Sequence, residues 1–451
     1  MTAVRTRYHA RWVLPIASEP IEDGTVVVEG DRIVWVGLRA AAPVGGNDDD
    51  LGNAVLMPGL VNAHTHLELT VMRGFLAGLP FFDWVRTLAR ARRDVLDEAA
   101  LLDSARLGVV EGLRAGITTF ADTGNSQAPF DALLELGARG IAYREVFGPA
   151  PEQAAEALAG LRASVDAMRA RETPLVRVGV SPHAPYSVSD ALFLMVAAYA
   201  RAERLPVAVH IAEGEDESLL VERGEGRFAD FLRSRGIPVA PRGRSPIALL
   251  ERCGVLAAQP LLIHAVRADA SDIATMARHR CGVAHCPASN AWLAHGIAPL
   301  VEMLAAGLDV GLGSDSMASN TRMDIVGEGR LAARQQLART PQSAGLPPLQ
   351  LLDLATRGGA RAIGLGDVVG VLAPGYQADL AAFAVEAAAS RAQDVAAAVV
   401  STETAVTRRV VVAGQLRVRD GVVLHDDASL AARVRDGAEA LARWRHRDPI
   451  D

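Results

Sequence analysis

The chain contains no lysine: all 46 basic residues among its 451 residues are arginine. This absence excludes a lysine Schiff base, a Walker A phosphate loop and a metal pair bridged by a carboxylated lysine. Cysteine is also scarce, and Cys253, Cys281 and Cys286 are too few and too unevenly spaced for a disulfide framework. We therefore expect reduced, packed thiols and, where a metal is bound, a single ion.

Long apolar runs and an excess of positive charge are also absent. No stretch approaches the roughly 18 to 20 uncharged apolar residues that cross a bilayer, and the first residues lack the apolar core of a signal peptide. The formal net charge is -7, whereas nucleic-acid binding usually needs a basic surface. We therefore expect a cytoplasmic protein that binds a small molecule, with neither a membrane nor a nucleic acid as its partner.

Eight short apolar runs alternate with segments of helical periodicity through the middle of the chain. Residues 97–114, 190–203 and 269–280 place apolar side chains three and four positions apart, as amphipathic helices do. Alternating strands and helices favour a parallel sheet, and eight repeats favour closure into a (β/α)8 barrel, a TIM-like α/β fold. The apolar runs cover residues 56–63, 116–122, 140–147, 176–183, 206–213, 260–266, 281–287 and 308–315.

The two ends of the chain have a different pattern. Residues 25–37 and 409–424 alternate in polarity around turns that contain glycine, which is typical of β-hairpins. We predict that both ends form one small β-sandwich domain, and two unrelated edge hairpins are the alternative. The predicted division is a β domain of residues 1–57 and 365–426, a barrel of residues 58–364, and a C-terminal surface helix of residues 427–451.

Histidine and aspartate follow several of the predicted strands. Side chains alternate along a strand, so His64 and His66 point to the same face, where two imidazoles can bind one cation. His210 and Asp315 follow two other strands, and in a parallel barrel these strand ends lie at one rim. Three imidazoles and a carboxylate favour Zn²⁺ or Fe²⁺ over Mg²⁺ or Ca²⁺. We predict a five-coordinate ion that lowers the pKa of one bound water to roughly 7, with Asp315 in contact with that water as much as with the ion.

Two further residues after strands are candidates for proton transfer. Glu213 lies three positions after His210, so a bend past the strand end must return its carboxylate to the metal, where it can take a proton from water. His264 can hold the water or stabilise the tetrahedral intermediate. The alternatives are that Glu213 is a solvated loop acid, one of several in residues 213–217, and that His264 makes ordinary hydrogen bonds.

The order and separation of these motifs resemble the amidohydrolase superfamily. The strings are VNAHTH, VSPHAPYSVS, VHIAE, IHAV, HCPASNAWLAHGIAP, GLGSDSMASN and GVLAPGYQADLAAFAV. The chain is most similar to the branch of 5-methylthioadenosine/S-adenosylhomocysteine deaminases, aminodeoxyfutalosine deaminases and related chlorohydrolases. Glu213 favours deamination, because dechlorinating relatives can lack an acid there. The resemblance implies metal binding by His64, His66, His210 and Asp315, and catalysis by Glu213, His264 and Asp315.

The resemblance also suggests four substrate-binding residues. His183, in SPHAPYS, matches a position that approaches the substrate, and Arg144, in AYREVFG, matches an arginine near its outer end that could pair a carboxylate. Asp83, directly before Trp84, resembles an acid that holds ribose hydroxyls, although a helix N-cap is an equal alternative. Glu68, in HTHLE, is more similar to aminodeoxyfutalosine deaminases than to the adenosylhomocysteine pattern.

The resulting hypothesis is a metal-dependent aminohydrolase that releases ammonia from the adenine ring of a nucleoside-like compound. Aminodeoxyfutalosine is the preferred substrate, followed by S-adenosylhomocysteine, methylthioadenosine and adenosine. Cleavage of an amidine, a cyclic amide or a C–Cl bond is the alternative, and a non-catalytic scaffold is a remote one. Barrels of this branch are often dimers or tetramers, so we expect a homo-oligomer. His285, Ser289 and Asn290 are candidates for the rim of the site and His295 and Trp292 for its mouth, and a purely structural role is the alternative for all five.

Overall fold

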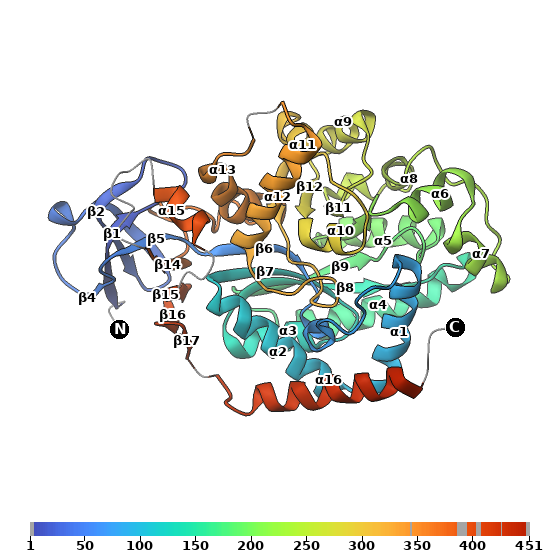
Figure 1. The fold of residues 1–451 in the computed structure, drawn as a ribbon, viewed down its shortest axis with the longest axis horizontal. Helices are drawn as coiled ribbons and strands as arrows, with labels where there is room; N and C mark the ends of the chain where they lie inside the picture. Colours follow the sequence, from blue (N-terminus) through green and yellow to red (C-terminus); the bar gives the residue numbers. More distant parts are fainter. Residues whose placement is uncertain (1–3, 343–344, 386–394, 403–406, 425, 448–451) are drawn as a thin grey trace.

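The computed structural model describes residues 4–342, 345–385, 395–402, 407–424 and 426–447. Eight parallel strands alternate with helices there and form two four-stranded sheets (Figure 1). Each predicted apolar run overlaps one of these strands. The first sheet contains β6 (Leu60–Thr65), β7 (Ile117–Gly124), β8 (Arg139–Val146) and β9 (Val176–Pro182), and the second contains β10 (Ala208–Ile211), β11 (Leu261–His264), β12 (Gly282–His285) and β13 (Asp309–Leu312).

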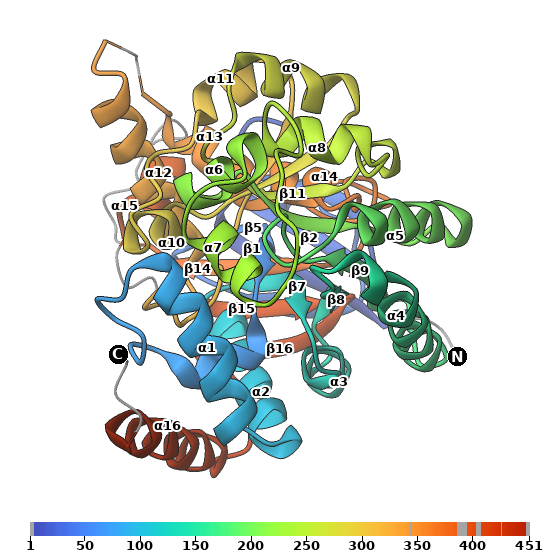
Figure 2. The ribbon, with the colours of Figure 1, turned by 90° about the vertical axis from the view of Figure 1, so that its right-hand side faces the viewer.

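Single parallel bridges join the two sheets on both sides. Val180 in β9 pairs with Val207, directly before β10, and Thr65 in β6 pairs with Asp315, shortly after β13. The backbone N–H of Asp315 donates to the carbonyl of His64 at 3.0 Å. Helices surround these strands (Figure 2). The predicted parallel α/β arrangement is therefore confirmed, whereas the closed barrel stays a prediction.

The helices begin where the sequence supplies capping groups. The Asp97 carboxylate accepts the N–H of Ala100 at 2.8 Å before α2, and the Ser189 hydroxyl accepts the N–H of Leu192 at 3.3 Å before α5. No helix in the described ranges is long and apolar enough to cross a membrane. The α-helices are α1 (Phe81–Val95), α2 (Glu98–Arg114), α3 (Ala128–Leu136), α4 (Ala154–Arg169), α5 (Asp190–Glu203), α6 (Glu215–Arg223), α7 (Arg227–Ser234), α8 (Pro246–Arg252), α9 (Ala270–Arg278), α10 (Pro287–Trp292), α11 (Leu300–Ala305), α12 (Ile325–Arg339), α13 (Pro348–Asp353), α14 (Gly359–Ala362), α15 (Val395–Ser401) and α16 (Leu430–Arg447).

Strands from both ends of the chain meet in one nine-stranded sheet, at the left of Figure 1. β14 pairs antiparallel with β5, with Leu380 opposite Pro58. The ladder connects all nine strands, so the two-layered sandwich stays a prediction. The predicted domain interval 365–426 also includes residues 386–394, 403–406 and 425, which lie outside the described ranges. The strands are β1 (Arg5–Val13), β2 (Ile21–Glu29), β3 (Arg32–Leu38), β4 (Asn47–Asp50), β5 (Ala54–Pro58), β14 (Leu380–Ala384), β15 (Thr407–Val412), β16 (Gln415–Arg419) and β17 (Val422–Val423).

The C-terminal segment forms the helix α16, which lies along α1 and α2 (Figure 1). The ring centroids of Trp444 and Phe75 are 6.4 Å apart, and Arg433 pairs with Asp103 at 2.6 Å. α16 ends at Arg447, and the last four residues of the predicted helix lie outside the described ranges. The helix α16 therefore packs against residues Leu67–Met72, which follow β6.

A buried ion pair joins the start of β8 to the nine-stranded sheet. Arg139 donates through Nε and Nη2 to the Asp379 carboxylate at 2.7 and 2.9 Å, and each residue is 3% exposed. Arg139 Nη2 also donates to Gln377 Oε1 at 3.2 Å, and Asp379 Oδ1 accepts the N–H of Ala413 at 2.8 Å. These additional hydrogen bonds help to replace the hydration that the two charged groups lose when they are buried.

Replacing Arg139 by alanine should destabilise the protein by about 3–5 kcal/mol, because Asp379 would stay buried without its cation. The measurement is chemical denaturation followed by circular dichroism. Arg169→Ala is the matched control, since the Arg169–Glu203 pair at 3.0 Å is exposed and such pairs contribute roughly 0–1 kcal/mol. Equal destabilisation by the two substitutions would contradict this interpretation of the buried pair.

Candidate metal centre

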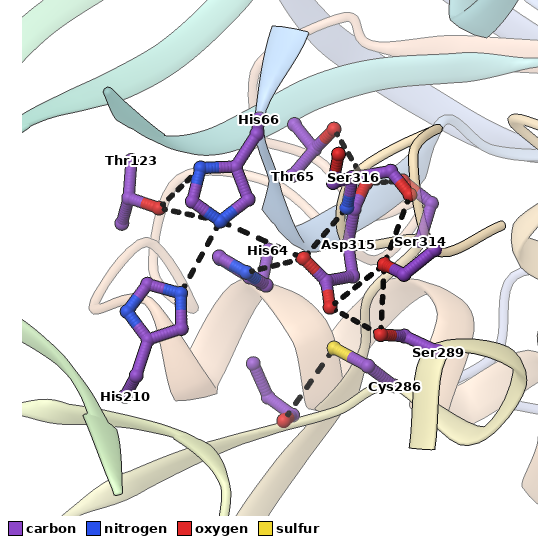
Figure 3. Close-up of polar contacts among 12 residues, drawn as sticks. His64, Thr65, His66, Thr123, His210, Cys286, Ser289, Ser314, Asp315 and Ser316 are labelled. Atoms are coloured by element: carbon purple, nitrogen blue, oxygen red, sulfur yellow. Dashed lines mark hydrogen bonds and ion pairs between the residues drawn. The ribbon is translucent and has the colours of Figure 1, made fainter. Parts of the chain in front are cut away.

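The four predicted metal ligands lie together at the carboxyl ends of the parallel strands. Nε2 of His66 is 3.2 Å from Nε2 of His210, and Asp315 Oδ1 is 3.2 Å from Nε2 of His64 and 3.6 Å from Nε2 of His66. Figure 3 shows these side chains converging from β6, β10 and the segment after β13. The geometry brings together residues that are up to 251 positions apart in the sequence.

Burial prepares these groups for metal binding. It lowers the pKa of His64 to about 4 and holds the pKa of His210 well below its usual range, so both imidazoles are neutral at neutral pH. For Asp315, burial alone would raise the pKa, but the His64 ring and the other nearby imidazoles outweigh it and keep the pKa well below normal. The result is a set of neutral nitrogen donors and one anionic oxygen, which is what a metal ion needs.

Three overlapping groups of side chains place their ligand atoms within 4.8 Å of one another. Imidazole nitrogens dominate all three groups, and such donors suit zinc and similar divalent ions. A divalent metal ion therefore fits this centre. The groups are His64 with His66 and Asp315, His64 with His210 and His264, and His66 with Glu145 and His210.

The predicted proton-transfer pair lies beside the centre. Glu213 Oε1 is 3.5 Å from Nε2 of His264 and 3.2 Å from Nε2 of His295. Ala212 has a left-handed backbone with φ of 48°, which supplies the bend that the sequence requires after β10. Burial alone would raise the pKa of Glu213, but His264 and His295 reverse this effect and lower it. Glu213 is therefore a buried carboxylate that stays ionised at neutral pH.

Several of the rim and mouth candidates hold site residues in place, which agrees with the structural alternative. The Ser289 hydroxyl donates to Asp315 Oδ2 at 2.5 Å, and Asn290 Oδ1 lies 3.0 Å from Nδ1 of His264. His295 contacts Glu213, as described above. Trp292 is 41% exposed and does not line the cavity within the described residues, whereas His285 is buried at 1% exposure.

Sequence reasoning missed Glu217, which fixes the position of Glu213. Its carboxylate accepts the backbone N–H of Ala212 at 2.9 Å and that of Glu213 at 2.8 Å, and its side chain is fully buried. Burial raises the pKa of Glu217 to about 8. Glu217 lies in the first turn of α6, and helix N-termini favour acids, so its position is a signal that the sequence contains. From the sequence alone, residues 213–217 are instead possible solvated loop acids.

A cavity of about 280 Å³ leads to the centre. Its polar end contains the metal-site residues, and α1 supplies much of an apolar wall. Of the four predicted substrate-binding residues, Glu68 and His183 line this cavity. Its other lining residues are His66, Leu69, Phe81, Trp84, Val85, Leu88, Ala89, Arg92, Arg93, Asn125, Glu145, Phe147, Tyr186, His210, Glu213, His264, Leu293, Asp315 and Ser316.

Asp83 and Arg144 are not among these lining residues within the described ranges. The Asp83 carboxylate accepts two hydrogen bonds from Arg227, at 2.7 and 2.8 Å. Arg144 is half-buried, and its Nη1 has no hydrogen-bond partner among the described residues. The substrate contacts of both residues stay predictions.

Glu145 is a cavity residue that sequence reasoning did not single out. Its Oε1 is buried without a hydrogen-bond partner among the described residues, and burial raises its pKa to about 7. Glu68, by contrast, accepts hydrogen bonds from Arg92 Nε at 3.2 Å, from the Asn125 N–H at 3.4 Å and from Ser126. Glu145 is thus the carboxylate of the cavity that is still open to a ligand.

Comparisons with known proteins agree with this geometry. Residues 55–417 match the model of the Amidohydrolase family. A 5-methylthioadenosine/S-adenosylhomocysteine deaminase from Moorella thermoacetica is 33% identical over 372 residues, which cover 82% of this chain and 83% of that protein. An adenosine deaminase structure from Xanthomonas campestris with bound zinc has a TM-score of 0.84 at 27% identity, covering 98% and 99% of the two chains. A structure of Helicobacter pylori aminofutalosine deaminase has a TM-score of 0.81 and covers 92% of this chain and 100% of that chain. Its sequence identity is 20%, so it supports the fold alone.

Replacing His210 by asparagine should reduce bound metal to well below one ion per chain, because a neutral nitrogen donor is lost from the centre. Elemental analysis after dialysis measures the metal content. His279→Asn is the matched control, since His279 lies away from the centre and contacts Glu251 at 3.1 Å. A full equivalent of metal in His210→Asn would contradict the assignment of His210 as a ligand.

Proposed function

The chain belongs to the amidohydrolase family and is a hydrolase of carbon–nitrogen bonds other than peptide bonds, and on this premise we propose that it deaminates the adenine ring of a nucleoside-like substrate. The observation that carries the proposal is the buried Glu213 carboxylate between His264 and His295, beside the cluster of metal-ligand side chains. Deamination needs a group that moves a proton to the ring, and Glu213 is placed to do so.

The side chains divide the chemistry between them. When bound by His64, His66, His210 and Asp315, a divalent ion lowers the pKa of water and supplies a nucleophile at neutral pH. Glu213 takes the proton that the water loses and delivers it to a ring nitrogen. His264, held by Asn290, stabilises the charge that develops at the attacked carbon. Glu213 then passes the second proton of the former water to the amino group, the C–N bond breaks, ammonia leaves, and the ring keeps the oxygen as a carbonyl.

We propose aminodeoxyfutalosine as the first substrate to test, followed by S-adenosylhomocysteine, methylthioadenosine and adenosine. Glu68 lines the cavity, which agrees with its similarity to aminodeoxyfutalosine deaminases. Arg92 and Arg93 line it as well. Aminodeoxyfutalosine and S-adenosylhomocysteine extend beyond the sugar to a carboxylate, which guanidinium groups bind well, whereas methylthioadenosine ends in a methylthio group. Arg92 is paired with Glu68 at 3.1 Å and Arg93 with Asp94 at 2.9 Å, so binding a substrate carboxylate there would require exchange of these ion pairs.

We assign to Glu145 the contact with sugar hydroxyls that the sequence suggested for Asp83. Asp83 is occupied by Arg227, whereas Glu145 lines the cavity with an oxygen that lacks a partner among the described residues. A carboxylate offers two oxygens and can accept from two neighbouring hydroxyls. The unpartnered oxygen supports this assignment, since a buried acceptor without a partner is costly.

The finer structural predictions form part of the same proposal. We infer that the eight parallel strands close into one barrel, because bridges join the two sheets on both sides. The proposed domains remain residues 1–57 with 365–426, residues 58–364 and residues 427–451. Zinc is the proposed ion, as in the similar Xanthomonas campestris structure, and Fe²⁺ is the alternative. A homo-oligomer stays a prediction.

The purified, metal-loaded protein should release one ammonia for each molecule of at least one of the four adenine compounds. The absorbance should change at the same time from that of adenine to that of hypoxanthine. Glu213→Gln should lower kcat by roughly 10²- to 10⁴-fold with little change in KM, because proton transfer is lost while substrate contacts remain. Glu215→Gln is the matched control, since Glu215 is exposed at the start of α6, two positions after Glu213. Release of chloride or of an amide product alone, with no adenine compound turned over, would refute the proposal.

Glu145→Gln should lower kcat/KM for adenosine by roughly 10- to 100-fold, which is the effect of losing hydrogen bonds to two hydroxyls. The same substitution should change kcat/KM for 2′,3′-dideoxyadenosine much less, because that compound lacks the neighbouring 2′ and 3′ hydroxyls that Glu145 is proposed to bind. Steady-state kinetics with both compounds and the metal content of the variant measure the effect. An equal loss with both compounds, or a loss of metal, would instead place Glu145 at the ion.

A further inference from the structure

A second cavity, of about 480 Å³, lies at the opposite end of the parallel strands from the metal centre. Its lining includes Arg177 at the second position of β9, Gly282 at the first position of β12 and Asp309 at the first position of β13. The metal-ligand side chains lie at the other ends of the parallel strands, with His210 near the end of β10 and Asp315 after β13. The two cavities are therefore separated by the length of the strands.

Five arginines line this second cavity, and Asp309 is the one acid that lines it within the described residues. None of the five forms an ion pair in the described ranges, and Arg201 donates to the Ala197 carbonyl of its own helix at 3.4 Å. Arginines elsewhere pair with acids even when exposed, as Arg252 does with Asp190 at 2.6 Å. The five residues, called the arginine rim below, are Arg177, Arg201, Arg204, Arg280 and Arg361.

The floor of the cavity is apolar and rigid. Ile141, Leu261 and Ile363 line it, and all three are buried in the same core cluster. A Cβ atom on Gly282 would lie 2.0 Å from the carbonyl oxygen of Ala362, so glycine is required where α14 crosses the start of β12. The arginine rim thus surrounds a fixed apolar surface.

We propose that this cavity binds a small phosphate-bearing anion. Five guanidinium groups and one carboxylate leave an excess of positive charge among the lining residues, although the whole chain carries -7. Guanidinium groups match phosphate oxygens with paired hydrogen bonds. The volume and the apolar floor provide space for an organic group attached to the phosphate. The concave shape and the negative net charge favour a small anion over a nucleic acid.

The test is isothermal titration of the full, metal-loaded chain with inorganic phosphate, pyrophosphate and ADP in separate experiments. The wild-type chain should bind at least one of these anions at a single site, and more weakly as salt increases. The double substitution R280S/R361S should weaken binding by roughly 10-fold or more, since each charge-assisted hydrogen bond contributes enough for such a change. Arg435→Ser is the matched control, because Arg435 is exposed on α16, away from the rim.

Two further measurements separate this site from the metal centre and from a folding defect. The His210→Asn variant should keep its affinity for the anion, because the metal is not involved. Circular dichroism should show that R280S/R361S is folded, and its turnover of any nucleoside substrate should be unchanged. Absence of binding to all three anions, equal weakening by Arg435→Ser, or loss of binding in His210→Asn would each overturn the proposal. None of these outcomes depends on deaminase activity.

Discussion

The contact between His64 and Asp315 links the architecture of the protein to its chemistry. The backbone N–H of Asp315 donates to the carbonyl of His64 and joins the segment after the last parallel strand to the first. Its carboxylate meanwhile lies against the His64 ring and accepts hydrogen bonds from Ser289 Oγ at 2.5 Å and from the Ser316 N–H at 2.6 Å. Because the same residue makes both contacts, the metal centre can form only where the two sheets meet.

The strand pattern could be predicted because buried parallel strands are continuous apolar runs, and each run here overlaps one strand. The positions of His64 and His66 followed from the alternation of side chains along β6. The course of α14 could not be predicted, since it depends on Gly282 and Gly311, whose missing side chains let Ala362 and Gly359 approach. Such close contacts join distant segments and leave no periodic signal in the sequence.

The differences within the site have similar causes. The motif around β8 suggests Arg144 as a substrate contact. However, Ile141 and Tyr143 pack into the core inside the parallel strands. Glu145 lies on the same face of β8 as these two residues and lines the cavity. The alternation along β8 would have favoured Glu145 over Arg144 from the sequence alone. For Asp83 no local signal existed, because its partner Arg227 is 144 positions away.

Charge balance at the centre is the physical argument for the proposed contact of Glu145 with a substrate, although Glu145 also lies within 4.8 Å of His66 and His210. The nearby His64 and His210 are neutral because they are buried, so the carboxylates of Asp315 and Glu213 already match the two charges of a divalent ion. A third carboxylate would leave the buried cluster negative, and Arg92 is already paired with Glu68 at 3.1 Å. In the proposed complex, hydroxyl donors of a substrate would satisfy Glu145 without adding negative charge to the buried cluster.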